Sequence, residues 1–234
     1  TSLTGGQPRT QNARVNHYEG QPYGMIAGFK IKEDASGNKV YNNASGLPIQ
    51  STIMPLGRGV PPLTLGLTNS LRYKAFNMSF LVDGKFGAKI YTSTNAYGTR
   101  FGLEKRTVEN GVREYGVTVK GVDQNGAPFT KLLSAQDYFQ GIAYSITDEF
   151  VYDADFIKLR QLTLGYSLTS NLVAKTPFQS ASLSLVARNL WMIYNQTPNV
   201  DPESSYSISG SSYGLENFGV PPTRSFGLNL LVRF

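Results

Sequence analysis

The feature that most constrains this fold is an alternation of apolar and polar residues, sustained over segments longer than ordinary globular strands. In 63–73 the odd positions are apolar except Asn69, and the even positions carry small polar residues, glycine and Arg72. A second alternating segment starts at Phe76 and continues to Tyr91, whereas strands of globular proteins usually have about five or six residues. A period of two places successive side chains on opposite faces of a strand. The sequence therefore predicts long strands with one apolar and one polar face.

The same pattern predicts six strands, separated by connections of very unequal length. The strands are expected near 22–31, 63–73, 76–91, 156–169, 180–194 and 223–234. Two connections are short, 74–75 and 170–178, and three are long, near 32–62, 92–154 and 195–221. Short periplasmic turns alternating with long extracellular loops are typical of outer-membrane β-barrels, and soluble Greek-key sandwiches have no reason to follow this rule.

Composition agrees with a membrane barrel. Only 16% of the residues are charged, against about 25% in average proteins, and 12% are aromatic. No apolar stretch approaches the roughly 18 residues of a membrane-spanning helix. Aromatic residues fall near the predicted strand ends, as an interfacial girdle requires. At the predicted inner rim these are Tyr73, Phe76, Phe178 and Phe234.

Several classes of function are disfavoured. The chain has no cysteine and one histidine, His17, so neither a cysteine-ligated metal site nor a Ser-His-Asp triad is expected. The net charge is +6, but the basic residues are scattered, whereas a nucleic-acid interface needs them clustered. Neighbouring carboxylates such as Asp148 and Glu149 give no evidence of a glycosidase pair across a cleft. We expect no enzymatic activity, no cofactor, no bound metal and no nucleic-acid partner.

Six strands do not complete a membrane barrel. Bacterial barrels of this kind need at least about eight strands, and an open sheet edge cannot lie in lipid because its backbone groups lack partners. The first residues also lack the basic and apolar regions of a signal peptide. We therefore expect this chain to be the C-terminal part of a larger protein.

Several stretches resemble the closing strands of the SusC/RagA-like TonB-dependent transporters. They are Phe80-Leu-Val-Asp-Gly-Lys-Phe-Gly-Ala-Lys-Ile-Tyr91, Gly102-Leu-Glu-Lys-Arg106, the segment 152–166, Ala187-Arg-Asn-Leu-Trp191, Asn199-Val-Asp-Pro-Glu203 and the segment 222–230. In order and spacing they cover the chain from about Leu63 to its last residue.

The resemblance implies an all-β fold: an antiparallel transmembrane barrel segment of about six C-terminal strands from a barrel of roughly 22. The plug domain and the N-terminal strands would be absent from this chain. The whole protein would import nutrient oligomers, glycan, oligosaccharide or peptide, across the outer membrane of a Gram-negative bacterium. Its implied partners are the remainder of the same transporter, a SusD-like surface lipoprotein, TonB through the missing N-terminal region, and membrane lipid.

Three groups of candidate site residues follow. The polar strand faces predict lumen-facing side chains, for substrate passage, plug docking or simply a hydrated interior: Arg72, Asp83, Lys85, Lys89, Arg188 and Arg224. In the outer loops, ligand or lipoprotein contacts are expected at Tyr97, Phe101, Tyr138, Asn199, Asp201 and Glu203. These aromatics could equally pack the loop on itself, and 199–203 could hold calcium or form a turn. The last strand resembles a barrel-insertion signal, with Phe226, Leu228, Leu230, Val232 and Phe234.

Two other interpretations remain open from the residues. One is a secreted, soluble all-β carbohydrate-binding module that uses the same loop aromatics. The other is a small, complete outer-membrane barrel with two further strands inside the long loops, for example around 116–122.

Overall fold

The computed structural model describes residues 2–4, 13–168, 173–174, 176–204 and 212–234. The chain divides into two compact units, each assembled from three segments. The first unit comprises Thr1–Pro61, Ala88–Ala154 and Thr197–Val220; the second comprises Pro62–Gly87, Asp155–Gln196 and Pro221–Phe234. Each unit is described by itself below.

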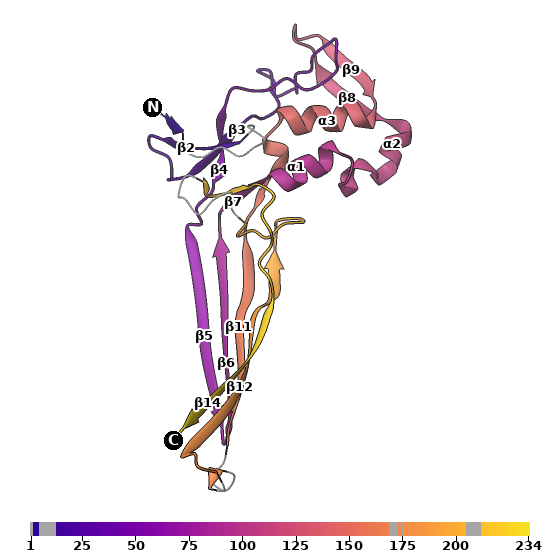
Figure 1. The fold of residues 1–234 in the computed structure, drawn as a ribbon. Coiled ribbons are helices and arrows are strands. Elements are labelled where there is room, and N and C mark those ends of the chain that lie inside the picture. The colour runs from indigo at the N-terminus through magenta and orange to yellow at the C-terminus, as the bar shows by residue number, and fades with distance from the viewer. Residues whose placement is uncertain (1, 5–12, 169–172, 175, 205–211) are drawn as a thin grey trace. The chain divides into compact units, whose positions relative to one another are not determined.

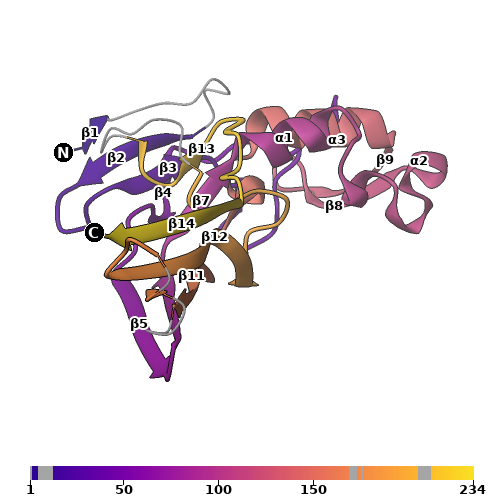
Figure 2. The same cartoon turned by 60° about the horizontal axis from the view of Figure 1, so that its bottom comes forward.

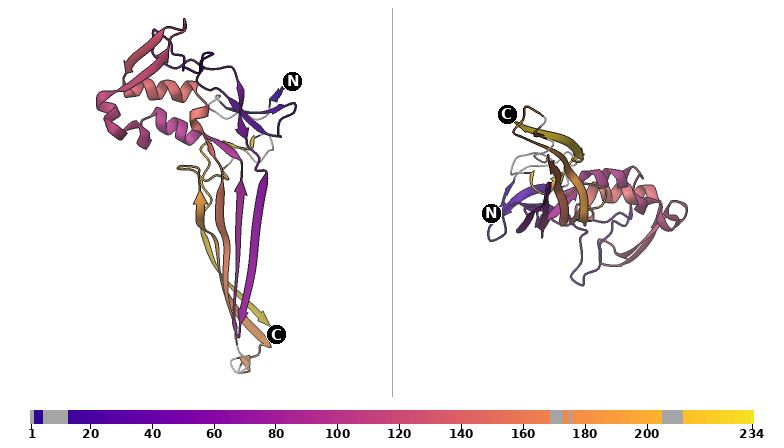
Figure 3. Two further views of the ribbon diagram at one scale, coloured as in Figure 1. Left: turned by 180° about the vertical axis from the view of Figure 1, so that it is seen from behind. Right: turned by 90° about the horizontal axis from the view of Figure 1, so that it is seen from below.

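The second unit is one antiparallel sheet of five long strands in the order β14-β12-β11-β6-β5 (Figure 1). The strands have 9 to 16 residues. They are β5 (Leu63–Tyr73), β6 (Phe76–Phe86), β11 (Phe156–Ser167), β12 (Ser180–Asn195) and β14 (Ser225–Arg233). The hairpin between β5 and β6 turns at Lys74, whose φ of 53° is left-handed. Figures 2 and 3 show the twist of this sheet, whose strands change direction from β5 to β14.

The strand register aligns apolar residues with apolar residues across all five strands. One row contains Leu71, Met78, Leu164, Leu185 and Leu228. The neighbouring row on the opposite face contains Arg72, Asn77, Gly165, Ser184 and Asn229. Because the register matches the alternation in every strand, the sheet has one apolar face and one polar face.

The first unit contains three smaller sheets. Strands β1 (Ser2–Thr4), β2 (Arg14–Tyr18), β3 (Met25–Gly28) and β4 (Met54–Arg58) form a four-stranded sheet in that order. Strands β10 (Val151–Asp153), β7 (Lys89–Thr92) and β13 (Leu215–Glu216) form a three-stranded sheet, also in that order. Strands β8 (Val117–Val122) and β9 (Pro128–Leu133) pair as a hairpin.

Helices α1 (Ser93–Arg100) and α3 (Ala135–Ser145) pack against each other in the first unit (Figures 1 and 3). The short helix α2 (Val112–Tyr115) lies between them in sequence, and single 3-10 turns occur at Lys105–Thr107, Glu109–Gly111 and Asp148–Phe150. None of the helices in the described ranges is long and apolar enough to span a membrane.

The two main helices begin in different ways. Helix α3 is capped by the residue directly before it, because the Ser134 hydroxyl accepts the Asp137 N–H at 3.0 Å. Helix α1 has no cap of this kind, and the fully buried Glu216 serves instead. Its carboxylate accepts the Thr94 N–H at 3.0 Å and the Thr94 hydroxyl at 2.8 Å. A negative charge at a helix N-terminus is favourable because the first N–H groups have no partner within the helix.

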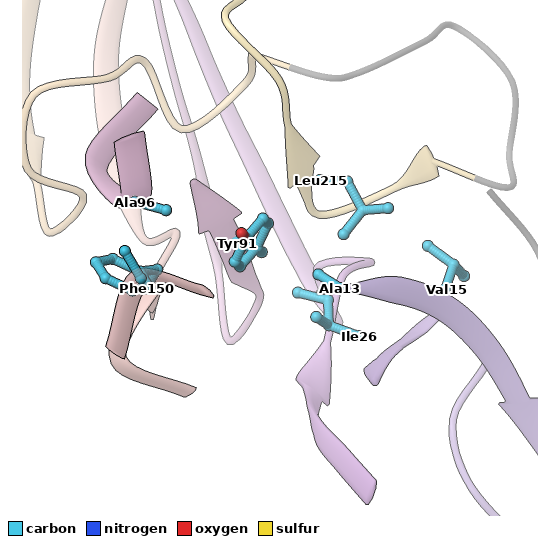
Figure 4. Close-up of a cluster of buried hydrophobic side chains, with 8 residues drawn as sticks. Ala13, Val15, Ile26, Tyr91, Ala96, Phe150 and Leu215 are labelled. Atoms are coloured by element: carbon cyan, nitrogen blue, oxygen red, sulfur yellow. The ribbon is translucent and has the colours of Figure 1, made fainter. Parts of the chain in front are cut away.

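The main core of the first unit brings distant parts of the chain together (Figure 4). Ala13, Val15 and Ile26 come from the N-terminal segment, whereas Tyr91, Phe150 and Leu215 come from segments far along the chain. All six side chains are fully buried. The same core contains Ala96 of α1 and Ala143 of α3.

The structure changes two of the expected strands. The strand expected near 22–31 is reduced to β3, which belongs to the four-stranded sheet and not to the sheet of long strands. The strand expected over 76–91 is two strands, β6 and β7, in different sheets. It breaks at Gly87, which adopts a left-handed φ of 78° and donates its N–H to the Asp155 carboxylate at 2.6 Å.

The expected outer loops are also more ordered than their sequence indicates. Residues 92–154 contain α1, α2, α3 and the β8–β9 hairpin, and this hairpin includes the 116–122 region considered for an extra membrane strand. Apart from one isolated bridge between Val40 and Val122, β8 and β9 pair with each other and not with the long strands. Residue 169, parts of the 170–178 connection and 205–211 lie outside the described residues.

Candidate functional site

Four of the six predicted lumen-facing residues lie on the polar face of the five-stranded sheet. Arg72 is opposite Asn77, and Arg188 is opposite both Gln161 and Ser225. Asp83 and Lys85 lie on the same face of β6. The structure thus brings these four residues to one face, along three of the strands.

Asp83 forms the best-defined ion pair of this face. Its two carboxylate oxygens accept hydrogen bonds from the Arg160 Nε and Nη2 atoms at 2.7 and 2.9 Å. Next to this pair lies the buried ring of Phe156, with the Lys85 and Lys158 ammonium groups 5.9 and 4.9 Å from its centroid. The Arg160 guanidinium is 5.8 Å from the same centroid, so three cations surround one aromatic ring.

Arg160 and Lys158 are site residues that the regular alternation of the sequence missed. The apolar positions from Leu162 onward are even-numbered, which would place Lys158 and Arg160 on the apolar face. The structure has a register shift between Leu159 and Gln161, so Arg160 is an extra residue and Lys158 lies opposite Asp83. The signal was available in the sequence, since two cations on an apolar face are unfavourable and a β-bulge reverses the faces.

The other two predicted lumen-facing residues are not placed on this face by strand pairing. Lys89 lies in β7 of the first unit, where its ammonium group pairs with Asp153 at 2.7 Å, because the strand breaks at Gly87. Arg224 lies one residue before β14, so strand pairing does not assign it to either face.

The apolar face of this sheet is exposed. Leu164 in the central strand is 44% exposed and Leu228 of β14 is 75% exposed. The predicted insertion residues Phe226, Leu228, Leu230 and Val232 all lie on this face, and the terminal Phe234 packs edge-on against Phe178 at 5.1 Å. An apolar area of this regularity requires a covering medium or partner.

Two of the expected outer-loop aromatics surround an arginine. The Arg100 guanidinium lies 3.9 Å from the ring centroid of Tyr144, 5.2 Å from Phe101 and 5.5 Å from Tyr97. Tyr97 also contacts Phe218 edge-on at 5.1 Å. Phe101 and Tyr144 are both more than half exposed. The structure therefore joins Tyr97 and Phe101 into one exposed aromatic cluster around a cation.

Tyr138 is separate from that cluster and packs into the interior. It contacts Phe139 edge-on at 5.3 Å and belongs to the shell around the buried residues Tyr41, Val119 and Leu133. Burial raises the pKa of the Tyr138 phenol above its usual value of 10.0, and the negative charge of Glu149 raises it further. Its surroundings therefore favour the neutral form.

This pKa direction predicts a loss of stability at alkaline pH. The Tyr138 phenol stays protonated in the folded state at a pH where the unfolded chain has released the proton. The unfolded state then binds fewer protons, so the free energy of unfolding falls as pH rises above about 10. Replacing Tyr138 by phenylalanine should reduce the fall, as measured by melting temperature between pH 8 and pH 11. An unchanged slope in Tyr138→Phe would contradict this assignment.

The segment 199–203 forms a hydrogen-bonded turn. Asn199, at a left-handed φ of 65°, donates its side-chain amide to Asn95 Oδ1 at 3.0 Å and to the two Glu104 carboxylate oxygens at 3.1 and 3.0 Å. The Asp201 carboxylate accepts the Glu203 N–H at 2.8 Å. Across the described ranges, no group of three or more histidine, aspartate or glutamate side chains is arranged to hold a metal ion.

A cavity of about 730 Å³ opens in the first unit between the C-terminal end of α1 and the N-terminal end of α3. Its wall includes Phe101, one of the predicted ligand-contact residues. The lining residues are Thr99, Arg100, Phe101, Gly102, Leu103, Thr107, Arg113, Ser134, Ala135, Gln136, Phe139 and Gln140. Sequence analysis did not single out this group, because its members come from three helices and the connections between them.

The long strands and the mostly antiparallel pairing define the class as an all-β protein. No known family profile matches the chain. Two relatives from Formosa agariphila do match it. TonB-dependent receptor P3 is 27% identical over 76% of the chain, and TonB-dependent receptor P26 is 24% identical over 89%.

Solved structures also match the fold of this chain. The RagAB peptide importer in its closed-closed state matches 99% of the chain with a TM-score of 0.56 and 14% identity. The RagAB peptide transporter matches 94% with a TM-score of 0.54 and 16% identity. The sequence homologues of this chain are thus TonB-dependent receptors and its structural neighbours are RagAB, which confirms the SusC/RagA-like resemblance. These relatives are receptors and transporters, not enzymes.

The chain is much shorter than the proteins it matches. It covers 17% and 20% of the two receptors and 22% of each of the two RagAB chains. What the whole protein transports, and with which partners, therefore belongs to the proposal below.

Proposed function

We propose that this chain is the C-terminal barrel-wall portion of an outer-membrane, TonB-dependent active importer of nutrient oligomers. The observation that carries the proposal is the five-stranded sheet, with an exposed apolar face on one side and aligned polar residues on the other. In the bilayer the apolar face would meet lipid, and the polar face, with Arg72, Asp83, Lys85 and Arg188, would line a hydrated lumen.

The two end strands of the sheet support a larger barrel. β5 and β14 are the terminal strands in the order observed for the described residues. Within lipid their outer backbone groups would need hydrogen-bond partners. We propose that further strands of the same transporter supply these partners and close the barrel, with a plug domain inside it.

The connections support an orientation in the membrane. The hairpin at 74–75 would be periplasmic, together with the C-terminal Phe234. The long connections, which build helices and small sheets in the first unit, would be extracellular. A large folded extracellular region offers contact surface for a ligand and for a SusD-like lipoprotein, and the RagAB structural neighbours are consistent with a two-component importer.

Transport energy would come from TonB through the N-terminal part of the whole protein. This segment contributes wall and loops to that process. The cargo is proposed to be a glycan, an oligosaccharide or a peptide; the matched RagAB is described as a peptide importer.

The two rival interpretations have less support from the fold. A soluble carbohydrate-binding module would cover its apolar sheet face, whereas Leu164 and Leu228 are exposed. A small complete barrel needs additional strands in the long loops, but the β8–β9 hairpin there does not join the long sheet.

The proposal is tested by uptake in the native bacterium. Cells lacking the gene for the full-length protein and cells lacking functional TonB should both fail to take up a labelled oligomer that wild-type cells import. Uptake of the corresponding monomer, which crosses general porins, serves as the matched control and should be unchanged. Normal oligomer uptake in the TonB-deficient cells would refute an active TonB-dependent importer.

A further inference from the structure

The cavity between α1 and α3 has positively charged side chains in its wall. Two arginines, Arg100 and Arg113, belong to its wall, and none of the residues that line it is acidic. The carboxylates next to wall residues in the sequence, Glu104, Glu114 and Asp137, are not part of the lining. Glu104 accepts hydrogen bonds from Asn199, and the Asp137 carboxylate accepts the Ser134 hydroxyl at 2.7 Å.

The Arg113 guanidinium is held in place by neutral acceptors. Its Nε atom donates to the Thr107 carbonyl oxygen at 3.1 Å, and its Nη2 atom donates to the Gly102 carbonyl oxygen and, at 3.3 Å, to the Thr107 hydroxyl. These contacts fix the side chain and leave its full charge uncompensated. The Nη1 atom has no bond among them.

The Arg100 guanidinium is held by aromatic rings instead. It lies over Tyr144 and beside Phe101 and Tyr97, at the distances given above. Such stacking orients the planar group without satisfying its N–H donors, which point around the edge of the plane. Its charge, like that of Arg113, is not balanced by an ion pair found in the described residues.

Four other cations of the same unit are held by carboxylates instead. Lys30 pairs with Asp148, Lys89 with Asp153, Lys105 with Glu109 and Arg106 with Glu149. The two arginines at the cavity are held by carbonyl oxygens, a hydroxyl and aromatic rings, and both guanidinium groups stay available to an anion.

The rest of the wall adds neutral donors and apolar area. Gln136 and Gln140 contribute side-chain amides. The N-cap Ser134 and the first helical residue Ala135 place the positive end of α3 at the wall. Phe101, Leu103 and Phe139 supply the apolar part. A volume of about 730 Å³ lies within the range of small-molecule sites, about 300–1,000 Å³.

We infer that this cavity binds a carboxylate group of an oligomer, with Arg100 and Arg113 as its ligands. Guanidinium groups match planar carboxylates through paired N–H donors, and Phe101 and Leu103 would contact the body of the molecule. This inference rests on the proposed import function, and it narrows the class of imported molecule to acidic oligomers. The carboxylate could come from a uronic acid or from a peptide C-terminus.

Binding to the purified full-length receptor in detergent tests this assignment and separates the two sources. The first probe pair is trigalacturonic acid and its methyl ester. The second pair is the tripeptide alanyl-alanyl-phenylalanine and its C-terminal amide. We expect at least one free acid to bind at least tenfold more tightly than its neutral partner, as measured by isothermal titration calorimetry. The pair that shows the difference identifies the source of the carboxylate.

Variants assign the binding to this cavity. Arg100→Gln should weaken the charged probe at least tenfold and leave the neutral one unchanged, and Arg100→Lys should recover part of the loss. Lys120→Gln removes an exposed cation of β8 in the same unit and should have no effect. Equal affinities within both pairs, no binding of either acid at millimolar concentration, or an unaffected Arg100→Gln would each overturn the inference. The uptake experiment with TonB-deficient cells does not depend on these binding measurements, so it tests the proposed import function separately.

Discussion

In the proposed importer, replacing Leu162 by arginine is expected to abolish stable assembly in the outer membrane. Leu162 lies in the middle of the central strand β11, on the apolar face, between Phe80 of β6 and Ala187 of β12. If this face meets lipid, an arginine at the bilayer midplane costs about 2–4 kcal/mol in a β-barrel. That is a large fraction of the 5–15 kcal/mol or so by which folded proteins are usually stable.

The neighbouring residue provides a matched control. Thr163 lies on the opposite, polar face, between Ser79 and Val186, where an added arginine can remain hydrated. Thr163→Arg is therefore expected to assemble at near wild-type levels. Both variants are scored by the amount of receptor in outer-membrane fractions and by its resistance to unfolding in unheated detergent gels. Equal assembly of the two variants would refute the assignment of faces to lipid and lumen.

Removing the Glu216 carboxylate is expected to produce the second large effect, in the first unit. This buried group holds the N-terminus of α1 through Thr94 and also accepts the Gly219 N–H at 3.1 Å. Hydrogen bonds to a charged group contribute about 1.5–3 kcal/mol each, and their effects are not additive. We expect Glu216→Ala to lower the free energy of unfolding of this unit by roughly 2–4 kcal/mol.

Two further variants test whether the loss of stability comes from the charge of the Glu216 carboxylate. Glu216→Gln keeps the shape and one acceptor oxygen but loses the charge, so it should lie between wild type and Glu216→Ala. Glu114→Ala removes an exposed glutamate from α2 and should change stability by less than about 0.5 kcal/mol. The measurement is the urea midpoint for protease cleavage within 93–100 of the full-length receptor. Similar midpoints for Glu216→Ala and Glu114→Ala would show that Glu216 does not hold the helix.

The long strands could be predicted because apolar and polar residues alternate along them, which gives each sheet face its own character. Prediction failed where backbone geometry interrupts the pattern. Gly87 separates β6 from β7 by a left-handed turn, although apolar and polar residues continue to alternate through it. The bulge at Arg160 exchanges the faces of Lys158 and its neighbours, and a rule based on period alone cannot include an extra residue.

The helices of the first unit had little signal in the sequence. Helix α1 contains threonine, asparagine and glycine and is capped by Glu216 from more than a hundred residues away, so no local motif marks its start. Aromatic residues of 92–154 were recognised as candidates for contact, but only the tertiary structure separates Phe101, at the cavity wall, from Tyr138, in the interior. Arg100 and Arg113 were missed because the sequence does not show that both side chains line one cavity.

The core of the first unit sets a condition on when this protein can fold. Ala13 and Ile26 pack with Leu215, so this core closes only after the chain has been made at least as far as Leu215. Contacts between such distant residues are slow to form because a long loop must close first. Until then the chain exposes residues such as Tyr91 and Phe150, which are fully buried in the folded unit. A core with this order of assembly needs its early segments to be protected from aggregation until Leu215 is available.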